Sequence, residues 1–271
     1  MSRGCPVPFD FAAGSVTGRA HLAAGRGSQD AVASRFGSRS LVAVVADGCG
    51  SGEHSEVGAA LGARLVVEAL GRRVDEGEKL DDAALWPALR DEVLGALSPL
   101  LSPLGGTRAE VVSELFLFTL VGFAITEGEG AVFACGDGVY AIDGEATVLG
   151  PFARNEPPYL GYGLLGPSDR SQLEVVRRFD PARIDWVLAG TDGAADLHGL
   201  AGRSLPGSDE LVGPLSSFAA DRFFTNKDAL RRRLALVNRE VTRPDWPARR
   251  LGREPGLLHD DTTLAIARRR A

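Results

Sequence analysis

Four acidic residues in this sequence stand where segments with the composition of β-strands begin or end. They are Asp30, Asp47, Asp192 and Asp260. Asp47 follows the apolar run 41–45 and precedes three glycines within five residues, which leave its carboxylate and the nearby carbonyl oxygens uncovered. Each acid alone fits an ordinary polar turn. Strand ends on one side of a sheet can converge, and clustered carboxylates favour a bound cation, so the four together predict a site for hard divalent cations.

These acids belong to five short motifs. In chain order the motifs are GRAHLAAGRGSQDA, DGCGSGEHSEVGAALGA, CGDGVYAI, GTDGAADL and DDTTLAIA. Their order and spacing, from Gly18 to Arg268, resemble the metal-dependent Ser/Thr protein phosphatases of the protein phosphatase 2C type. The resemblance is strongest to a bacterial branch in which a Gly-x-x-His segment, here Gly18 to His21, precedes a Gln-Asp pair.

The resemblance implies an α+β fold, a four-layer α-β-β-α sandwich of two mostly antiparallel sheets flanked by helices. We expect a single catalytic domain over residues 1–271, with a helical insertion at about 199–255 beside the cleft. That insertion contains Phe218, Phe223, Phe224 and the run Arg231 to Arg233, and we expect it to select the substrate.

The resemblance also implies a ligand set for two Mn²⁺ or Mg²⁺ ions, with a third ion left open. Asp47 would bridge the two ions, the Gly48 carbonyl would bind one of them, and Asp192 and Asp260 would hold the other. Asp30 would bind through water. Two such ions lie about 3.5–4 Å apart and activate a water for in-line attack on phosphorus. Oxygen ligands favour these metals over zinc.

Two positions depart from the family pattern, and two residues are candidates for binding phosphate. Cys49 stands where the family often has a His that protonates the leaving group, and Gln29 stands where it has a Glu. Arg26 lies near where the family has a phosphate-binding arginine, and His21 is the second candidate for contacting phosphate. Water, His21 or His54 would then protonate the leaving group. A packing role for the His and a solvated loop position for the Arg stay open.

Three functions remain compatible with the sequence. The first is hydrolysis of phospho-Ser and phospho-Thr in a protein partner, a Ser/Thr kinase or its targets, in bacterial signal transduction. The second is a pseudophosphatase that binds such a partner without catalysis. The third is a phosphatase for small phosphate esters. Three clustered acids have no purpose in a pure scaffold, which favours catalysis.

Composition excludes several other classes. The 271 residues carry a net charge of −6, which argues against a nucleic-acid-binding surface. No apolar run reaches membrane-spanning length. The three cysteines are Cys5, Cys49 and Cys135; their odd number argues against a disulfide framework, and none has the glycine-rich cradle of a cysteine phosphatase. We expect a cytoplasmic monomer.

Hydrophobic periodicity predicts the elements that must position these residues. Expected strands are 16–21, 31–36, 41–46, 115–125, 131–134, 139–142, 146–149, 173–179 and 184–189, and expected helices are 55–74, 81–101 and most of 207–242. In the first helix we expect Ser55 as N-cap and a stripe of Val57, Leu61 and Leu65. We also expect close packing of this helix at its small residues, Gly58, Ala59, Gly62 and Ala63.

Overall fold

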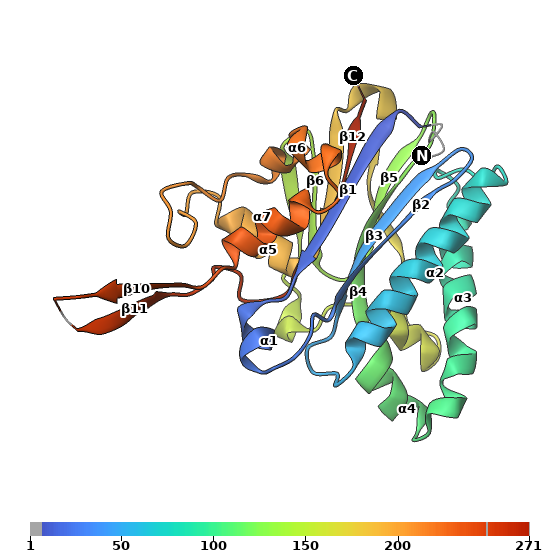
Figure 1. Cartoon of the computed structure of the whole chain (residues 1–271). Helices are drawn as coiled ribbons and strands as arrows, with labels where there is room; N and C mark the ends of the chain where they lie inside the picture. The colour runs from blue at the N-terminus through green and yellow to red at the C-terminus, as the bar shows by residue number, and fades with distance from the viewer. Residues whose placement is uncertain (1–6, 248, 271) are drawn as a thin grey trace.

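Two five-stranded sheets form the centre of the molecule, and all their strand pairings are antiparallel (Figure 1). The computed structural model describes residues 7–247 and 249–270. The first sheet has the order β1 (Phe9–Val16), β12 (Thr262–Arg269), β9 (Trp186–Gly190), β6 (Gly138–Ile142) and β7 (Glu145–Leu149). The second has the order β2 (Asp30–Phe36), β3 (Leu41–Gly48), β4 (Phe118–Ile125), β5 (Gly130–Cys135) and β8 (Glu174–Phe179).

Strand β3 shows how the sequence produces this double layer. Its side chains alternate between two apolar cores because successive residues of a strand point to opposite faces. Leu41 and Val45 lie in the core between the two sheets. Val42 and Val44 lie in the core under the helices that cover the second sheet. Since both faces are buried, the strand is apolar throughout, which explains the uninterrupted run in the sequence.

Helices cover the outer face of each sheet. The helices α2 (Ser55–Asp75) and α3 (Leu85–Leu97) pack on the second sheet, and α5 (Asp192–Gly199), α6 (Arg222–Thr225) and α7 (Ala229–Val237) pack on the first (Figure 1). Two further short helices are α1 (Arg19–Ala23) and α4 (Arg108–Val111). The α+β class and the helix–sheet–sheet–helix order are therefore confirmed.

Short helical turns fill several connections. They are Ser98–Leu100, Ser102–Leu104, Ala153–Asn155, Leu160–Leu164, Asp169–Ser171, Pro181–Arg183 and Leu215–Ala219, with a π-helical turn at Val112–Phe116. The expected helix 81–101 is therefore shorter, because prolines begin new 3₁₀ turns beyond Leu97. The strand expected from 115 begins at Phe118, after the π-helical turn.

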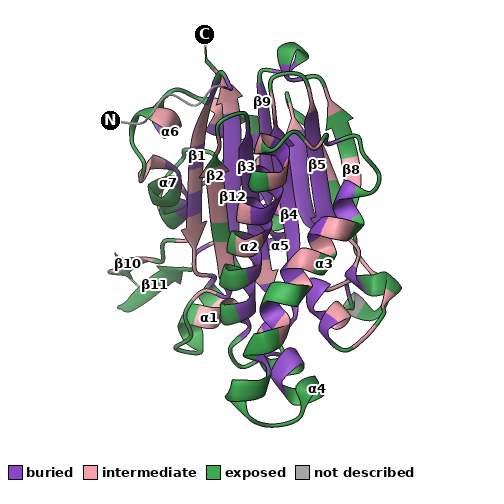
Figure 2. Ribbon diagram, turned by 90° about the vertical axis from the view of Figure 1, so that its right-hand side faces the viewer, coloured by how far each residue is buried: buried purple, intermediate pink, exposed green. Residues whose placement is uncertain are grey.

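Helix α2 packs inward at its small residues, but the large side chains of the expected stripe do not all face the core (Figure 2). Val57 and Leu61 are 38% and 37% exposed, so the prediction of a buried stripe of large side chains is wrong. The expected close packing of the small residues is confirmed, because the helix lies directly against the sheet. The buried residues include Gly58, Ala59, Gly62 and Ala63, and also Val66, Val67, Leu70 and Val74. A Cβ atom on Gly62 would lie 2.2 Å from the ring of Phe118.

The chain also differs from expectation near the N-terminus. The prediction of a strand at 16–21 is wrong, because β1 ends at Val16 and His21 lies in helix α1. The chain must turn there because Gly18 passes directly over the backbone of Asp260. A Cβ atom on Gly18 would lie 2.3 Å from the Asp260 carbonyl carbon.

The segment 199–255 is only partly helical. Besides α6 and α7 it contains a hairpin of β10 (Val241–Asp245) and β11 (Arg250–Glu254), which projects away from the body of the molecule in both views (Figures 1 and 2). The expectation of helix over most of 207–242 is therefore wrong. Gly207 and Gly213 have positive φ angles of 76° and 84°, which interrupt any helix between Gly199 and α6.

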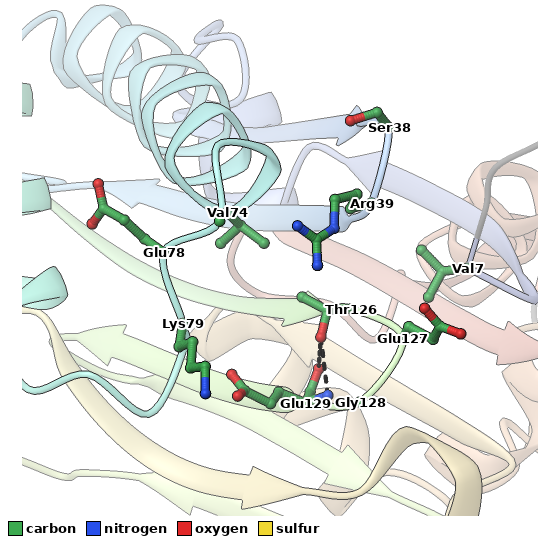
Figure 3. A pocket seen from close by; sticks show the side chains of 11 residues that line it. Val7, Ser38, Arg39, Val74, Glu78, Lys79, Thr126, Glu127, Gly128 and Glu129 are labelled. Carbon is green, nitrogen blue, oxygen red and sulfur yellow. Dashed lines mark hydrogen bonds between the residues drawn. The ribbon is translucent and has the colours of Figure 1, made fainter.

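One cavity of about 450 Å³ lies at the end of the second sheet where β3 begins (Figure 3). Arg39, Lys79, Val74 and Thr126 are among the side chains that line it. Asp47 lies at the other end of β3, so this cavity is separated from the acidic residues by the length of the strand. Within residues 7–247 and 249–270, none of the helices combines the length and the apolar character that a membrane crossing requires.

Candidate active site

Strand register places two of the four acids side by side. Asp30 begins β2 and is the direct partner of Asp47 near the end of β3. Directly opposed residues of an antiparallel pair have Cα atoms about 4.5–5.5 Å apart. The short connection between these two strands therefore brings together carboxylates that lie seventeen positions apart in the sequence.

The other sheet supplies the remaining two acids. Asp192 is the first residue of α5, directly after β9, and Asp260 lies just before β12. Thr191 joins the two sheets at this point. Its hydroxyl donates to Asp30 Oδ2 over 2.9 Å and accepts from the Thr263 backbone N–H over 3.1 Å. The four acids thus lie where one end of each sheet comes together, close enough for the charges of Asp30, Asp192 and Asp260 to act on Asp47.

Burial and mutual repulsion raise the pKa values of Asp30, Asp47 and Asp192. Burial raises the pKa of Asp30 to about 7, and repulsion from Asp261 and Asp192 adds to this effect against hydrogen bonds from two threonines. Burial and the charge of Asp260 raise the pKa of Asp192 to about 7. Burial, followed by the charges of Asp30, Asp192 and Asp260, raises the pKa of Asp47 well above its ordinary value. Ionising all of them together requires a compensating positive charge.

A divalent cation fits this set of donors. Asp30 Oδ1 is buried and has no hydrogen-bond partner among the described residues, so it is available as a ligand. The four candidate side-chain donors are carboxylates, which suit Mg²⁺ or Mn²⁺. Next to Asp47, a Cβ atom on Gly48 would lie 2.7 Å from Ser55 atoms, so this position accepts no larger residue.

Asp261 is a site residue that the sequence reasoning missed. It is 1% exposed and accepts hydrogen bonds from the backbone N–H of Gly18 at 2.7 Å and of Gln29 at 2.6 Å. The Nδ1 of His21 lies 2.8 Å from Oδ2, the same oxygen that accepts from Gln29, whereas Gly18 donates to Oδ1. Ligand atoms of His21, Asp260 and Asp261 all lie within 4.8 Å of one another. The oxygens of Asp261, however, are already hydrogen-bonded to the two backbone nitrogens and to the His21 ring. Asp261 therefore organises the N-terminal motif around the acids; the doubled Asp in DDTT was the only sequence signal for it.

Gln29 also has a structural role in this arrangement. Its side chain is 3% exposed, and Nε2 donates to the Gly52 carbonyl at 3.1 Å and to Ser55 Oγ at 2.7 Å. The amide thus holds the glycine-rich loop after Asp47 against the start of β2. The expectation that Ser55 is the N-cap of α2 is wrong. Ser55 is the first residue of the helix and its hydroxyl accepts from Gln29, whereas His54 occupies the N-cap position without a side-chain cap.

The two phosphate-binding candidates differ in their surroundings. His21 has a 16% exposed side chain and its Nδ1 is engaged by Asp261, which leaves Nε2 available. Arg26 is exposed in the loop after α1, and its guanidinium makes no hydrogen bond or ion pair with another described residue. Its backbone N–H donates to the His21 carbonyl at 2.9 Å. The structure brings His21 to the acids but leaves Arg26 in solvent.

The two described cysteines have opposite environments. Burial alone would raise the pKa of the Cys49 thiol, but hydrogen bonds with Ser51 and Tyr159 lower it below its ordinary value. The Cys49 sulfur lies 3.1 Å from Ser51 Oγ. Burial raises the pKa of Cys135 to about 12, which makes that thiol unreactive. Cys5 lies outside the described residues.

Comparisons with known proteins agree with this architecture. A family model described as protein phosphatase 2C matches residues 17–236. The crystal structure of a bacterial serine phosphatase is similar over 96% of this chain and 98% of its own, with 13% identity and a TM-score of 0.53. The structure of a variant of a bacterial serine phosphatase is similar over 98% of this chain and 100% of its own, with 14% identity and the same TM-score, 0.53. The catalytic domain of the serine threonine protein phosphatase PstP in complex with two manganese ions gives 96% and 97% coverage, 18% identity and a TM-score of 0.49.

At these identities the similarity to solved structures shows the fold alone. A comparison with curated proteins gave no match.

Proposed function

Because the chain belongs to the protein phosphatase 2C family of serine/threonine phosphatases, we propose that it hydrolyses phosphoserine and phosphothreonine in a protein partner with the help of two divalent cations. The observation that carries this proposal is the cluster of mutually repelling carboxylates at the end of the two sheets, of which Asp30, Asp47 and Asp192 are partly buried. Such a cluster destabilises the folded protein unless cations bind to it.

Each acid has a defined part in holding the cations. Asp47, which is within electrostatic reach of the other three acids, is suited to bridge two ions, with the Gly48 carbonyl beside it. Asp192 and Asp260, whose charges act on each other, would hold one ion together. Asp30 carries the unpaired buried oxygen and completes the set, directly or through water. When bound, Mn²⁺ or Mg²⁺ supplies Lewis acidity and a more acidic water for attack on phosphorus.

His21 is suited to orient the phosphoryl group. Its hydrogen bond with the buried Asp261 fixes the ring, so that Nε2 is the nitrogen left to contact a phosphoryl oxygen. Arg26 lies in the exposed loop that follows and would add a guanidinium contact only when a substrate draws that loop inward. The partner would be a Ser/Thr kinase or one of its targets.

A pseudophosphatase and a small-ester phosphatase are the two competing functions. A binding module has no use for partly buried carboxylates that repel one another, so the pKa shifts favour catalysis over the first alternative. The acids themselves recognise only a phosphoryl group and do not separate the second alternative from the proposed function.

One assay tests the proposal against both alternatives. The purified chain is stripped of metal with EDTA, supplied with Mn²⁺, and tested on p-nitrophenyl phosphate and on a phosphothreonine peptide. We expect metal-dependent turnover of both, with kcat/KM higher for the peptide. No turnover of either compound would identify a pseudophosphatase, and turnover of p-nitrophenyl phosphate alone would favour a small-ester phosphatase.

A further inference from the structure

The hairpin formed by β10 and β11 is an unpartnered element of the fold; we name residues 241–254 the hairpin arm. Within the described part of the chain its two strands pair only with each other, and every residue of β11 is exposed. The arm stands clear of both sheets in two perpendicular views (Figures 1 and 2). A two-stranded hairpin is only marginally stable in water by itself, so its retention as a projecting arm points to contact with another molecule.

The side chains of the arm suit an acidic protein partner. Trp246 is 80% exposed and Leu251 is 64% exposed. The arm carries four arginines against two acids, although the whole chain has a net charge of −6. Neither Arg249 nor Arg253 forms an ion pair with another described residue. Tryptophan and arginine are the residues that most often anchor protein–protein contacts.

The base of the arm is tied to the acidic site. The residues after β11 lead directly to Asp260, and on the way the carbonyls of Leu258 and His259 each accept a hydrogen bond of 3.1 Å from the backbone N–H groups that open helix α1. This is the helix that carries His21. At the start of the connection, Glu254 accepts from the Gly207 N–H at 2.9 Å. The arm and the site therefore share one hydrogen-bonded connection.

The length of the arm decides which substrates it can contact. Strands of five residues at about 3.3 Å per residue place the tip roughly 17 Å from the base. The acids lie beyond the base, after the connection 255–259, so a small phosphate ester bound there cannot touch the tip. An extended chain needs at least about five residues to run the length of the arm.

We propose that the hairpin arm docks phosphoprotein substrates that carry acidic residues about five or more positions from the phosphorylated residue. This inference rests on the proposed function, because the arm matters for catalysis only if the acids dephosphorylate a protein. The carboxylates of the substrate would meet Arg249 and Arg253, and an adjoining apolar side chain would cover Trp246.

The run Arg231 to Arg233, expected from the sequence to select the substrate, is less suited to this role. Arg233 is 10% exposed; it pairs with Glu210 at 2.6 Å and donates to the Leu211 carbonyl at 2.7 Å. Its replacement would disturb the fold. Phe218 and Phe223 are buried, at 1% and 3% exposure, and Phe224 lies under the guanidinium of Arg268.

Tryptophan fluorescence tests docking without catalysis. The chain has three tryptophans, and Trp86 and Trp186 are only 5% and 8% exposed, so a change on binding at the arm reports on Trp246. Metal-free protein is titrated with a phosphothreonine peptide that carries a run of glutamates, and with a matched peptide in which glutamine replaces them. We expect the tryptophan emission to shift to the blue with the glutamate peptide only, and we expect no such shift in Trp246→Phe. The affinity for the glutamate peptide should be about fivefold lower in an Arg249→Ala/Arg253→Ala variant.

A kinetic comparison tests the same point in the metal-loaded enzyme. Arg249→Ala/Arg253→Ala should raise KM for the glutamate peptide about fivefold. The KM values for p-nitrophenyl phosphate and for the glutamine peptide should stay within about twofold of those of the wild type. The matched control is Arg231→Ala/Arg232→Ala, which removes two exposed arginines of α7 outside the arm. This variant should change none of the three KM values.

The outcomes separate this inference from the proposed function. A fluorescence response equal for the two peptides, or an equal rise of KM in the control variant, would overturn docking at the arm. Absence of turnover of every compound by the wild type would overturn the proposed function, and the fluorescence titration would still decide whether the arm binds acidic peptides.

Discussion

Burial makes the carboxylates of the candidate site sensitive to pH in the absence of metal. The pKa values of Asp30 and Asp192 are raised to about 7 from an ordinary 3.8. The folded protein thus binds these protons more tightly than the unfolded chain does. Their contribution to stability is complete below about pH 3.8 and is lost as the pH rises through about 7.

We therefore expect the Tm of metal-free protein in EDTA to fall between about pH 5 and pH 8, and to fall less steeply in Asp30→Asn, which cannot ionise. Thermal unfolding across this range measures the slope. Asp209→Asn, an exposed acid, is the control and should follow wild type. An Asp30→Asn slope as steep as that of wild type would show that burial does not strain this carboxylate.

Cys49 occupies the position where the family often has a leaving-group acid, and its contacts are local. Its thiol lies against Ser51 and its pKa is lowered by the hydrogen bonds to Ser51 and Tyr159 against the effect of burial. We expect Cys49→Ala to change turnover by less than about tenfold, short of the loss usual for a general acid. Cys49→His should raise kcat on a phosphothreonine peptide but leave p-nitrophenyl phosphate unchanged, because nitrophenolate needs no proton. A large loss in Cys49→Ala on both substrates would instead indicate thiolate ligation of a metal.

At the scale of elements, the backbone of residues 260–261 is held between two glycines. Gly18 approaches the Asp260 carbonyl carbon, and Gly193 at the start of α5 approaches the Asp261 carbonyl oxygen, where a Cβ atom would lie only 2.0 Å away. This contact sets the distance between α5 and the start of β12. It therefore sets the separation of Asp192 and Asp260.

Gly193→Ala should force these two elements apart and lower Mn²⁺ affinity and turnover by more than about tenfold, with a lower Tm. Gly199→Ala, at the other end of the same helix, is a matched control because a Cβ atom there meets nothing within 4 Å. Calorimetric titration with Mn²⁺ and a thermal scan would check both variants. Equal behaviour of the two variants would refute the steric argument.

Elements that are apolar on both faces or regularly periodic were predictable from the sequence. Strand β3 and helix α3, whose Leu85, Leu89, Val93 and Leu97 are all buried, lie close to where periodicity placed them. The small residues of α2, such as Gly62, were correctly expected to pack closely, but the hydrophobic stripe was not a guide to burial because Val57 and Leu61 are exposed. The hairpin arm was missed because its alternation is polar and it packs on no core.

At the scale of the whole molecule, the acids could be identified from their motifs, but their supports could not. Asp261 and Gly18 are separated by 243 positions, and their hydrogen bond exists only because β1 and β12 are neighbours in one sheet. The hydrogen bond from Thr191 to Asp30 could not be predicted either, because it joins two sheets across 161 positions of the sequence. The single-domain organisation, the monomeric state and the cytoplasmic location stay predictions.

The measurement that tests the central claim most directly is Mn²⁺-dependent turnover of a phosphothreonine peptide by Asp47→Ala beside wild type. Asp47 is the acid on which the charges of Asp30, Asp192 and Asp260 all act, so its removal should abolish the shared cation site. We predict that turnover falls by orders of magnitude, while the Tm in EDTA equals or exceeds that of wild type because carboxylate repulsion is relieved. Turnover near that of wild type in a folded Asp47→Ala protein would contradict the account.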